Sequence, residues 1–375
     1  MRIAMVTETY PPEVNGVART IALTVDALRV RGHSIQLVRP RQNGHDVVGD
    51  APGFETLLRP GFPIPRYTQL QMGLPSRRAL ERAWSEQRPE VVHIATEGPL
   101  GWSALSAAHR LRLPVATDFR TNFHTYMRNY GVPWLARPVT SYLRSFHNRA
   151  ACTMVPTREM AEALAAQGFE RLRVVARGVD TKVFHPQRRS RELRASWGAG
   201  DDTPVVLCVS RFAREKNFAL VIEAYQAMRR ICAEAKLVFV GDGPLAEELR
   251  RKNVGFVVAG RKADAELARH YASGNVFLFA SMSETWGNVT LEAMASGLAI
   301  IAYDYAAARE TLRHGESALL APFGDAKAFV AQAERLARDP ELVRALGRAV
   351  RAAAEALAWG RIVAEFEAVL HDVAS

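Results

Sequence analysis

The chain has 375 residues, of which 48% are hydrophobic and 23% charged, and its formal net charge is +10. This is the composition of a soluble globular protein, and it argues against a disordered or membrane-spanning chain. The length predicts two domains of ordinary size. Three cysteines, Cys152, Cys208 and Cys232, lack the spacing of a metal site, so we expect reduced thiols in a cytoplasmic protein. The first segment, MRIAMVTETYPP, predicts a strand and no export signal.

The positive charge is concentrated in the first half of the chain. Residues 1–190 contain 26 Lys and Arg against 15 Asp and Glu, whereas residues 191–375 contain 23 against 24. The excess consists almost entirely of arginine. It predicts an anionic partner for the first half: a nucleic acid, a membrane surface or a phosphorylated ligand.

Short apolar runs alternate with helical patterns along the chain, which predicts parallel sheets with helices on both faces. Many runs are continuously apolar, as expected of strands buried on both sides. In the first half the predicted strands are Arg2–Thr7, Ser34–Val38, Val91–Thr96, Pro114–Phe119, Ala151–Val155 and Val174–Val179. In the second half they are Val205–Val209, Lys236–Gly241, Val254–Ala259, Val276–Ala280, Ala299–Tyr303 and Ala318–Pro322. Helices are predicted between them, for example Val17–Arg31 and Phe218–Arg230.

The pattern restarts after a polar segment, HPQRRSRELRASWGAGDDTP at residues 185–204, which we interpret as a linker with a short helix. The prediction is an α/β protein with two doubly wound, Rossmann-like domains, residues 1–190 and 191–358. A last helix, from Trp359 to Val373 within residues 359–375, is expected to cross back to the first domain.

Two glutamates flank the start of a predicted helix in the stretch SETWGNVTLEAMASGLAII. Glu284 follows the predicted strand Val276–Ala280. Glu292 lies about one turn inside the helix predicted for Val289–Ser296, which Gly297 is expected to end. The carboxyl end of a strand in an open parallel sheet is where ligands bind, so both carboxylates are candidates for ligand contacts.

The layout of this stretch fits a nucleotide sugar, in which a diphosphate lies between a ribose and a hexose. Asn288 is predicted to be the N-cap, the free N–H groups at the helix start suit a phosphate, and Gly287 allows the phosphate to approach. Glu292 can accept hydrogen bonds from ribose hydroxyls, and Glu284 from hydroxyls of a second group beyond the diphosphate. The alternative is that Glu284 is a solvated loop residue and Glu292 an ordinary first-turn glutamate.

Two cations, Arg211 and Lys216, follow the predicted strand Val205–Val209 in the segment VSRFAREKN. At the carboxyl edge of the same sheet they suit a diphosphate, although a solvated charge pair is the alternative. The turn in FVGDGPLAEEL, residues 239–249, is a weaker phosphate-loop signal.

These motifs, in this order, resemble those of the retaining glycosyltransferases of family 4, which have the GT-B fold. The matching segments are SRFAREKN, VGDGP, SMSETWGNVTLEAMASGLAIIA, HGESALLAPFGD, TETYPPEVNGVART and RGVDTKVFHP, and they span essentially the whole chain. The resemblance implies two Rossmann-like domains that face a cleft. It also implies an N-terminal domain that binds the acceptor and a C-terminal domain that binds the nucleotide sugar.

The resemblance implies a role for each matching residue at the donor site. Arg211 and Lys216 are expected to bind the diphosphate and to act in catalysis. Glu292 is expected to bind the ribose hydroxyls, and Glu284 the hydroxyls of the donor sugar. Backbone N–H groups are expected to complete the phosphate cradle at Gly287, Asn288 and Val289.

Other matching positions lie outside this cluster. His124, in TDFRTNFHTYMRNYG, matches the family's active-site histidine, and Gly16, in EVNGV, matches a glycine that approaches the diphosphate. Without the family, His124 is a surface or structural residue and Gly16 a turn residue. Arg261 and Lys262 follow a predicted strand at a place where a nucleotide base can be read.

The implied reaction needs neither a protein nucleophile nor a metal. Preorganised cations and helix N–H groups stabilise the charge that develops on the leaving nucleoside diphosphate. Front-face attack, in which the leaving phosphate oxygen takes the acceptor proton, is the mechanism attributed to the family. No Asp-x-Asp motif flanks the phosphate loops, so no cofactor is expected. Glu284 as a covalent nucleophile is the alternative.

The donor and the acceptor are less strongly specified. The closest resemblance is to enzymes that transfer mannose or a glucose-type sugar to lipids, and it favours GDP-mannose as donor. The alternative is a UDP-sugar-dependent glucosyl or glucuronosyl transferase that forms glycolipids. Two other classes are a GT-B nucleotide-sugar epimerase and a nucleic-acid-binding protein. The second lacks a zinc pattern, a helix-turn-helix signal and an RNA-binding sheet motif, so no nucleic acid is expected as partner.

Residues 131–150, GVPWLARPVTSYLRSFHNRA, combine apolar side chains and arginines at near-helical spacing. One interpretation is a domain helix with a buried apolar side; the other is a helix on an anionic membrane surface. The apolar set is Trp134, Leu135, Val139, Tyr142, Leu143 and Phe146, and the arginines are Arg137, Arg144 and Arg149. Residues 59–78 are predicted to be an exposed loop rich in Pro and Arg. Together these segments predict a protein peripheral to the inner face of the membrane, with a lipid-linked acceptor.

Overall fold

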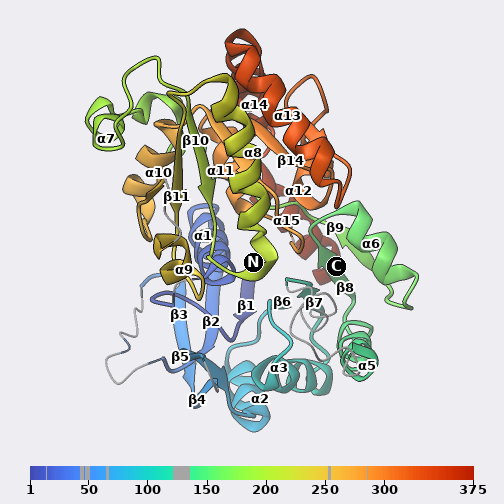
Figure 1. Cartoon of the computed structure of the whole chain (residues 1–375). Helices are drawn as coiled ribbons and strands as arrows, with labels where there is room; N and C mark the ends of the chain where they lie inside the picture. The colour runs from blue at the N-terminus through green and yellow to red at the C-terminus, as the bar shows by residue number, and fades with distance from the viewer. Residues whose placement is uncertain are drawn as a thin grey trace. The chain divides into compact units, whose positions relative to one another are not determined.

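The computed structural model describes residues 1–375 except 14, 43–45, 47–50, 65–66, 121–135, 252–254 and 285, and the side chains of 64, 67–70 and 136. The chain forms two compact units, each around one parallel sheet (Figure 1). Unit 1 consists of Met1–Ala176 and Ile362–Ser375, and unit 2 of Arg177–Arg361. In the described part of the chain, no helix has the length and apolarity needed to cross a bilayer.

Unit 1 contains a seven-stranded sheet in which all neighbouring strands are parallel. In spatial order the strands are β3 (Phe54–Arg59), β2 (Ser34–Pro40), β1 (Arg2–Val6), β6 (Val91–Ile94), β7 (Val115–Asp118), β8 (Cys152–Val155) and β9 (Leu172–Val174). The helices are α1 (Gly16–Val30), α2 (Arg77–Glu86), α3 (Pro99–Arg110), α5 (Ala136–His147) and α6 (Arg158–Ala165). The last helix, α15 (Trp359–Ala374), joins this unit from Ile362 onward.

Unit 2 contains a six-stranded parallel sheet. Its strands in spatial order are β12 (Val257–Val258), β11 (Lys236–Val240), β10 (Val205–Val209), β13 (Val276–Phe279), β14 (Ala299–Tyr303) and β15 (Leu319–Ala321). The α-helices are α7 (Arg191–Ser196), α8 (Phe218–Ile231), α9 (Ala246–Arg251), α10 (Asp264–Ala272), α11 (Asn288–Ala295), α12 (Ala306–Thr311), α13 (Ala326–Arg338) and α14 (Pro340–Glu355). Two 3₁₀ turns are η2 (Pro186–Arg188) and η3 (Arg214–Lys216).

In unit 2, strand order places a switch point between β10 and β13. From β10 the chain moves to β11 and β12 on one side, then returns to β13 on the other. Helix α8 packs against α13, and α11 packs against α14. The loops that leave the carboxyl ends of β10 and β13 therefore diverge, which is the arrangement that binds ligands in open α/β sheets.

Continuously apolar runs were the most dependable strand signal. Strands β10 and β14 occupy the predicted ranges, and all five residues of each are buried. The prediction was wrong at β9, which ends at Val174, and β12 contains only two residues. Strand β3, at the sheet edge, was not predicted because FETLLR mixes polar and apolar residues, all half-buried.

Residues 59–78 do not form the predicted loop. They contain an antiparallel hairpin of β4 (Gly61–Ile64) and β5 (Tyr67–Gly73). The buried Glu8 carboxylate holds the end of this hairpin, since it accepts hydrogen bonds from Gly73 N at 2.5 Å and Leu100 N at 2.9 Å. Burial raises the pKa of Glu8 to about 7, against the lowering effect of these backbone hydrogen bonds.

The two units divide earlier in the chain than the predicted boundary at residue 190. Residues 177–190 belong to unit 2, where Val179 forms a bridge with Ala358. Arg351 Nη1 donates to Phe184 O at 3.2 Å and to Ala295 O at 2.7 Å. These contacts attach the segment before η2 to unit 2, whereas the sequence pattern showed only a polar stretch.

Helix α5 buries apolar residues that, in one of the two interpretations of its sequence, contact a membrane surface. Leu143 and Phe146 are 5% and 0% exposed, and Val139 packs against the cluster that contains Phe119. Tyr142 is 43% exposed, but its hydroxyl donates to a backbone carbonyl of the same unit. The interpretation as a membrane-lying helix is therefore wrong for Leu143 and Phe146, because the core of unit 1 already covers them.

The cysteines are free, as expected, and Cys152 and Cys208 are buried. Burial raises the pKa of the Cys152 thiol to about 11 and that of Cys208 to about 12. Both thiols are therefore protonated and unreactive near neutral pH.

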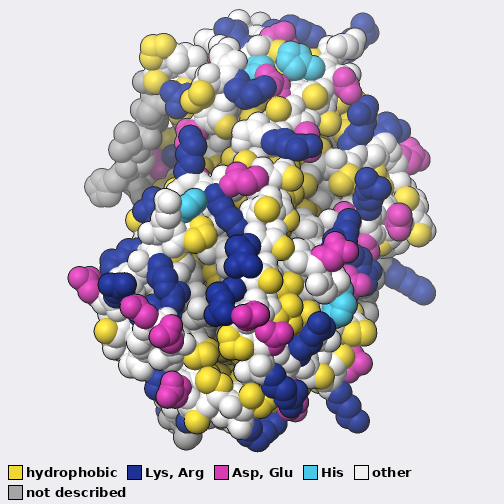
Figure 2. Space-filling model, turned by 90° about the horizontal axis from the view of Figure 1, so that it is seen from above, with side chains coloured by type: hydrophobic (Ala, Val, Ile, Leu, Met, Phe, Trp, Pro, Cys, Tyr) yellow, Lys and Arg dark blue, Asp and Glu magenta, His cyan; other side chains and the backbone are white. Residues whose placement is uncertain are grey.

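On the surface, Lys and Arg side chains lie among Asp and Glu on the face shown in Figure 2.

The C-terminal helix packs on unit 1, as predicted. Glu367 accepts a hydrogen bond from Arg31 Nε at 2.6 Å, and its other carboxylate oxygen lies 2.6 Å from His33 Nε2. Phe366 packs edge-on against His93, with ring centroids 4.9 Å apart. Burial raises the pKa of Glu367, but Arg31 and His33 together lower it below its ordinary value of 4.5.

We expect Glu367→Gln to destabilise the protein by about 1–2 kcal/mol at pH 7, because a charged hydrogen bond is lost. The loss is not larger because Arg31 is partly exposed to water, which weakens its ion pair with Glu367. A carboxylate with a lowered pKa stabilises the fold fully above its ordinary pKa, and the effect is lost as the pH falls through the folded value. The difference between wild type and variant should therefore shrink below pH 4.5. Urea unfolding between pH 3.5 and 7 measures it; a difference independent of pH would contradict this assignment.

Candidate active site

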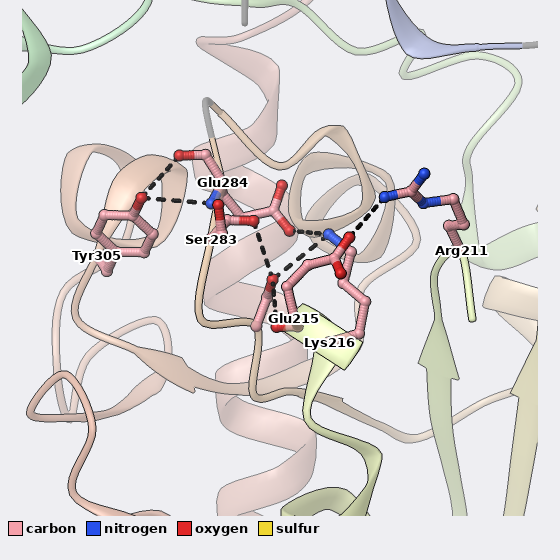
Figure 3. A network of polar contacts seen from close by, with 7 residues as sticks. Arg211, Glu215, Lys216, Ser283, Glu284 and Tyr305 are labelled. Carbon is pink, nitrogen blue, oxygen red and sulfur yellow. Dashed lines mark hydrogen bonds and ion pairs between the residues drawn. The ribbon is translucent and has the colours of Figure 1, made fainter. Parts of the chain in front are cut away.

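The predicted donor residues of unit 2 gather at the switch point of its sheet. Arg211 follows β10, Lys216 ends η3, and Glu284 lies in the loop after β13. Figure 3 shows these side chains from close by, with Lys216 and Arg211 each directed at a carboxylate. The fold thus brings together residues that are separated by more than sixty positions in the chain.

Lys216 and Glu284 form the centre of the site. The ammonium group contacts Glu284 Oε1 directly and lies 3.4 Å from Ser281 Oγ. Both side chains are only 14% exposed, so the ion pair is partly shielded from water. The ammonium also lies 5.5 Å from the ring centroid of Phe279, which adds a cation–π contact.

Arg211 lies at the outer side of the same network. Its Nη2 donates to Glu215 Oε1 at 2.6 Å; the side chains are 44% and 12% exposed. Glu215 is fixed through its backbone, since Met282 N donates to Glu215 O at 2.7 Å. The pairs Arg211–Glu215 and Lys216–Glu284 are joined in one chain of contacts across the ends of β10 and β13 (Figure 3).

The loop that carries Glu284 is held by Tyr305. The Tyr305 hydroxyl donates to Glu284 O at 2.8 Å and accepts from Glu284 N at 3.3 Å. On the other side, Asn217 has φ +53°, a left-handed conformation that asparagine tolerates, and it turns the chain from Lys216 into α8. Both carboxylate and ammonium are thus positioned by their backbones.

The start of α11 differs from the prediction in one respect. Asn288 is the first helical residue and does not cap the helix; the N-cap is Gly287, with φ +101°. Only glycine adopts this conformation without strain, which explains its place. The N–H groups of Asn288 and Val289 belong to the unpaired first turn of a helix. Gly297, with φ +74°, ends the helix as predicted.

Glu292 projects from the second turn of α11 and is half-buried. Its Oε2 accepts a hydrogen bond from the Tyr271 hydroxyl at 2.9 Å, and the same hydroxyl lies 3.3 Å from Val289 O. Tyr271 is fully buried on α10. The Tyr271 hydroxyl therefore orients one carboxylate oxygen of Glu292.

The other predicted site residues either lie in other parts of the fold than Lys216 and Glu284 or fall outside the residues that the structure describes. Gly16 is the first residue of α1 in unit 1, after the N-cap Asn15. Arg261 and Lys262 lie between β12 and α10, and within the described residues no hydrogen bond joins them to Glu284. His124 lies outside the described residues, so its role stays a prediction.

Three residues of the site were not predicted: Glu215, Tyr271 and Tyr305. Glu215 lies next to Lys216 in the segment VSRFAREKN. An acidic residue between Arg211 and Lys216 was the feature of the sequence that could have indicated it. Tyr271 and Tyr305 come from α10 and the turn before α12, and nothing in their local sequence marks them. Their contacts arise only in the folded unit, where α10 packs against α11 and the turn before α12 lies against the loop after β13.

The chain matches two family models, "Glycosyltransferase Family 4" over residues 14–183 and "Glycosyl transferases group 1" over residues 203–339. It is 34% identical to a GDP-mannose-dependent alpha-mannosyltransferase of Mycobacterium tuberculosis, over 87% of this chain and 85% of the relative. The chain belongs to glycosyltransferase family 4. This family 4 glycosyltransferase is also 27% identical to an alpha-monoglucosyldiacylglycerol synthase of Streptococcus pneumoniae, over 81% of this chain and 71% of the relative.

Among solved structures, the family 4 glycosyltransferase resembles a sucrose-phosphate synthase from Thermosynechococcus elongatus, with a TM-score of 0.77. The identity is 20%, and the match covers 99% of this chain and 98% of the other. The prediction of two Rossmann-like α/β units of the GT-B class is confirmed. The protein is a nucleotide-sugar-dependent hexosyltransferase.

Proposed function

We propose that this glycosyltransferase transfers mannose from GDP-mannose to a lipid-linked acceptor with retention of configuration. The observation that carries the proposal is the 34% identity to a GDP-mannose-dependent enzyme over 87% of the chain. The relative whose name specifies a glucosyl diacylglycerol product supports a lipid acceptor. It also supports the second candidate, a UDP-sugar-dependent enzyme that forms a glycolipid.

In the proposed mechanism, Arg211 and Lys216 bind the diphosphate and stabilise the charge that grows on it as the glycosidic bond breaks. The N–H groups of Asn288 and Val289, with Gly287 at the N-cap, complete the phosphate cradle. The leaving phosphate oxygen accepts the proton of the attacking acceptor hydroxyl, so no protein nucleophile and no metal are required.

Two carboxylates fix the ends of the donor in this proposal. Glu292, oriented by Tyr271, accepts hydrogen bonds from the ribose hydroxyls, and Glu284 accepts them from the donor hexose. His124 and Gly16, both in unit 1, act in the same reaction, and Arg261 and Lys262 read the base. Unit 1 binds the acceptor.

We expect GDP-mannose to stabilise the protein more than UDP-glucose or ADP-glucose does. At a hundredfold excess over its dissociation constant a ligand stabilises a protein by about 2.7 kcal/mol, which thermal-shift measurements detect readily. Transfer of labelled sugar to lipid is measured alongside. Stabilisation and transfer with UDP-glucose alone would favour the second candidate; turnover of the donor in the absence of any acceptor product would indicate an epimerase.

We also propose peripheral binding to anionic membranes through exposed arginines of unit 1. Arg137 and Arg144 are exposed on α5, where Arg144 also donates to Gln167 O, and Phe62 and Leu74 at the hairpin are 38% and 42% exposed. A basic residue near an anionic surface contributes about 1 kcal/mol. Exposed arginines with two apolar side chains suit the headgroup region of a bilayer.

We expect the double variant Arg137→Glu, Arg144→Glu to bind phosphatidylglycerol vesicles roughly thirtyfold more weakly, because about 2 kcal/mol of attraction is lost. Co-sedimentation at several salt concentrations measures this. The matched control is Arg344→Glu with Arg348→Glu, two exposed positions on α14 of unit 2. Equal binding of wild type to neutral and anionic vesicles, or to neither, would overturn the membrane proposal.

A further inference from the structure

A pocket of about 570 Å³ opens in unit 1 at the carboxyl ends of β2 and β3. Its volume lies in the range of small-molecule sites, and the carboxyl edge of an open parallel sheet is a preferred place for ligands. The described residues that line it are Arg41, Gln42, Leu58, Arg59, Pro60 and Gly61. None of them belongs to the donor site of unit 2.

The walls of this pocket are joined by backbone hydrogen bonds. Arg41 N donates to Arg59 O at 2.8 Å, so the residues that follow β2 and end β3 are held side by side. Leu74 N donates to Pro60 O at 2.8 Å and closes the base of the hairpin over the same edge. The two arginines therefore start from fixed backbone positions on neighbouring strands.

Among the described residues, the carboxylate of Asp46 lies next to the pocket and is already paired. Asp46 is 3.1 Å from Arg39 Nη1 and accepts from Gln42 N at 2.6 Å; the Asp46 and Arg39 side chains are 2% and 6% exposed. Within the described residues, neither Arg41 nor Arg59 forms an ion pair with a carboxylate, and Arg59 Nε is buried without a hydrogen-bond partner. A buried donor of this kind costs free energy until a ligand or water satisfies it.

We propose that this pocket binds a phosphate ester of the acceptor through Arg41 and Arg59. Planar guanidinium groups match the oxygens of a phosphate in a bidentate fashion, and two of them suit a group with one to two negative charges. Leu58 and Pro60 supply an apolar wall for the alcohol part of the ester, and the volume holds more than a bare ion. The inference rests on the proposed function, since it assigns an acceptor class to that transferase.

The first experiment measures binding without catalysis. Glycerol 3-phosphate and inorganic phosphate are titrated into wild type, Arg41→Gln and Arg59→Gln by calorimetry. Loss of one charged hydrogen bond predicts roughly tenfold weaker binding of glycerol 3-phosphate for each variant. The control is Arg88→Gln, since Arg88 is exposed and lies just before β6, at the opposite, amino edge of the sheet. Absence of binding to wild type, or equal binding by all variants, overturns the proposal.

The second experiment separates the possible sources of the phosphate. Sugar transfer is measured to soluble glycerol 3-phosphate, to phosphatidylglycerol vesicles and to vesicles that carry diacylglycerol in phosphatidylcholine. We expect Arg41→Gln and Arg59→Gln to raise KM about tenfold for the phosphate-bearing acceptor that is used, with donor KM unchanged. If sugar is transferred to diacylglycerol alone and neither variant changes this transfer, the proposal that the pocket binds a phosphate is wrong, whereas the proposed transferase function stands. If no sugar is transferred to any acceptor and no donor binds, the proposed function is wrong. The calorimetric titrations still test whether the pocket binds a phosphate ester.

Discussion

The Lys216→Ala variant is expected to lose about 10²-fold in kcat while its donor KM changes little. Lys216 is the least exposed cation of the site, at 14%, and lies among Glu284, Ser281 and the ring of Phe279. A preorganised donor in such a place is worth about 10²–10³-fold in kcat when it faces charge that grows in the transition state. Steady-state kinetics with a saturating acceptor measure the effect.

Arg211→Ala should follow the same pattern with a smaller loss, roughly tenfold, because Arg211 is 44% exposed and already shared with Glu215. Arg214→Ala is the matched control, since Arg214 is an exposed arginine of the 3₁₀ turn η3, which also contains Lys216. Thermal unfolding of each variant separates loss of activity from loss of the fold. If only KM rises, these cations bind ground state and transition state equally, and the proposed role in leaving-group stabilisation is wrong.

The Glu292→Ala variant is expected to raise donor KM by about 10- to 100-fold. A carboxylate that accepts hydrogen bonds from two ribose hydroxyls contributes about 1.5–3 kcal/mol, because both bonds are charge-assisted. The carboxylate is oriented by the Tyr271 hydroxyl at 2.9 Å, so Tyr271→Phe should give a weaker effect in the same direction. Titration with GDP alone measures the nucleotide part of the affinity.

Glu223→Ala provides the control for loss of one negative charge, because Glu223 is exposed on α8 of the same unit. Nucleotide affinity that is unchanged in Glu292→Ala would overturn the ribose assignment. It would return Glu292 to the simpler interpretation of a helix glutamate bonded to Tyr271.

The sequence predicts those residues of the candidate site that follow the carboxyl end of a strand. Arg211, Lys216 and Glu284 come directly after apolar runs, and parallel strands bring their carboxyl ends to one edge whatever the details of packing. Asn288 was assigned wrongly as the N-cap because its side chain favours that role, whereas Gly287 reaches a left-handed conformation that asparagine adopts less readily.

The sequence by itself determined the alternation of strands and helices around parallel sheets, although not β3 or the β4–β5 hairpin, and it identified the family. These depend on local pattern: β10 and β14 are apolar throughout and were placed correctly to the residue. Only the tertiary structure decided that Tyr271 and Tyr305 hold the two glutamates and that Leu143 and Phe146 face a core. It also decided that Arg41 and Arg59 share a pocket. Contacts between separate elements depend on which faces meet when the chain folds, and no local pattern contains that information.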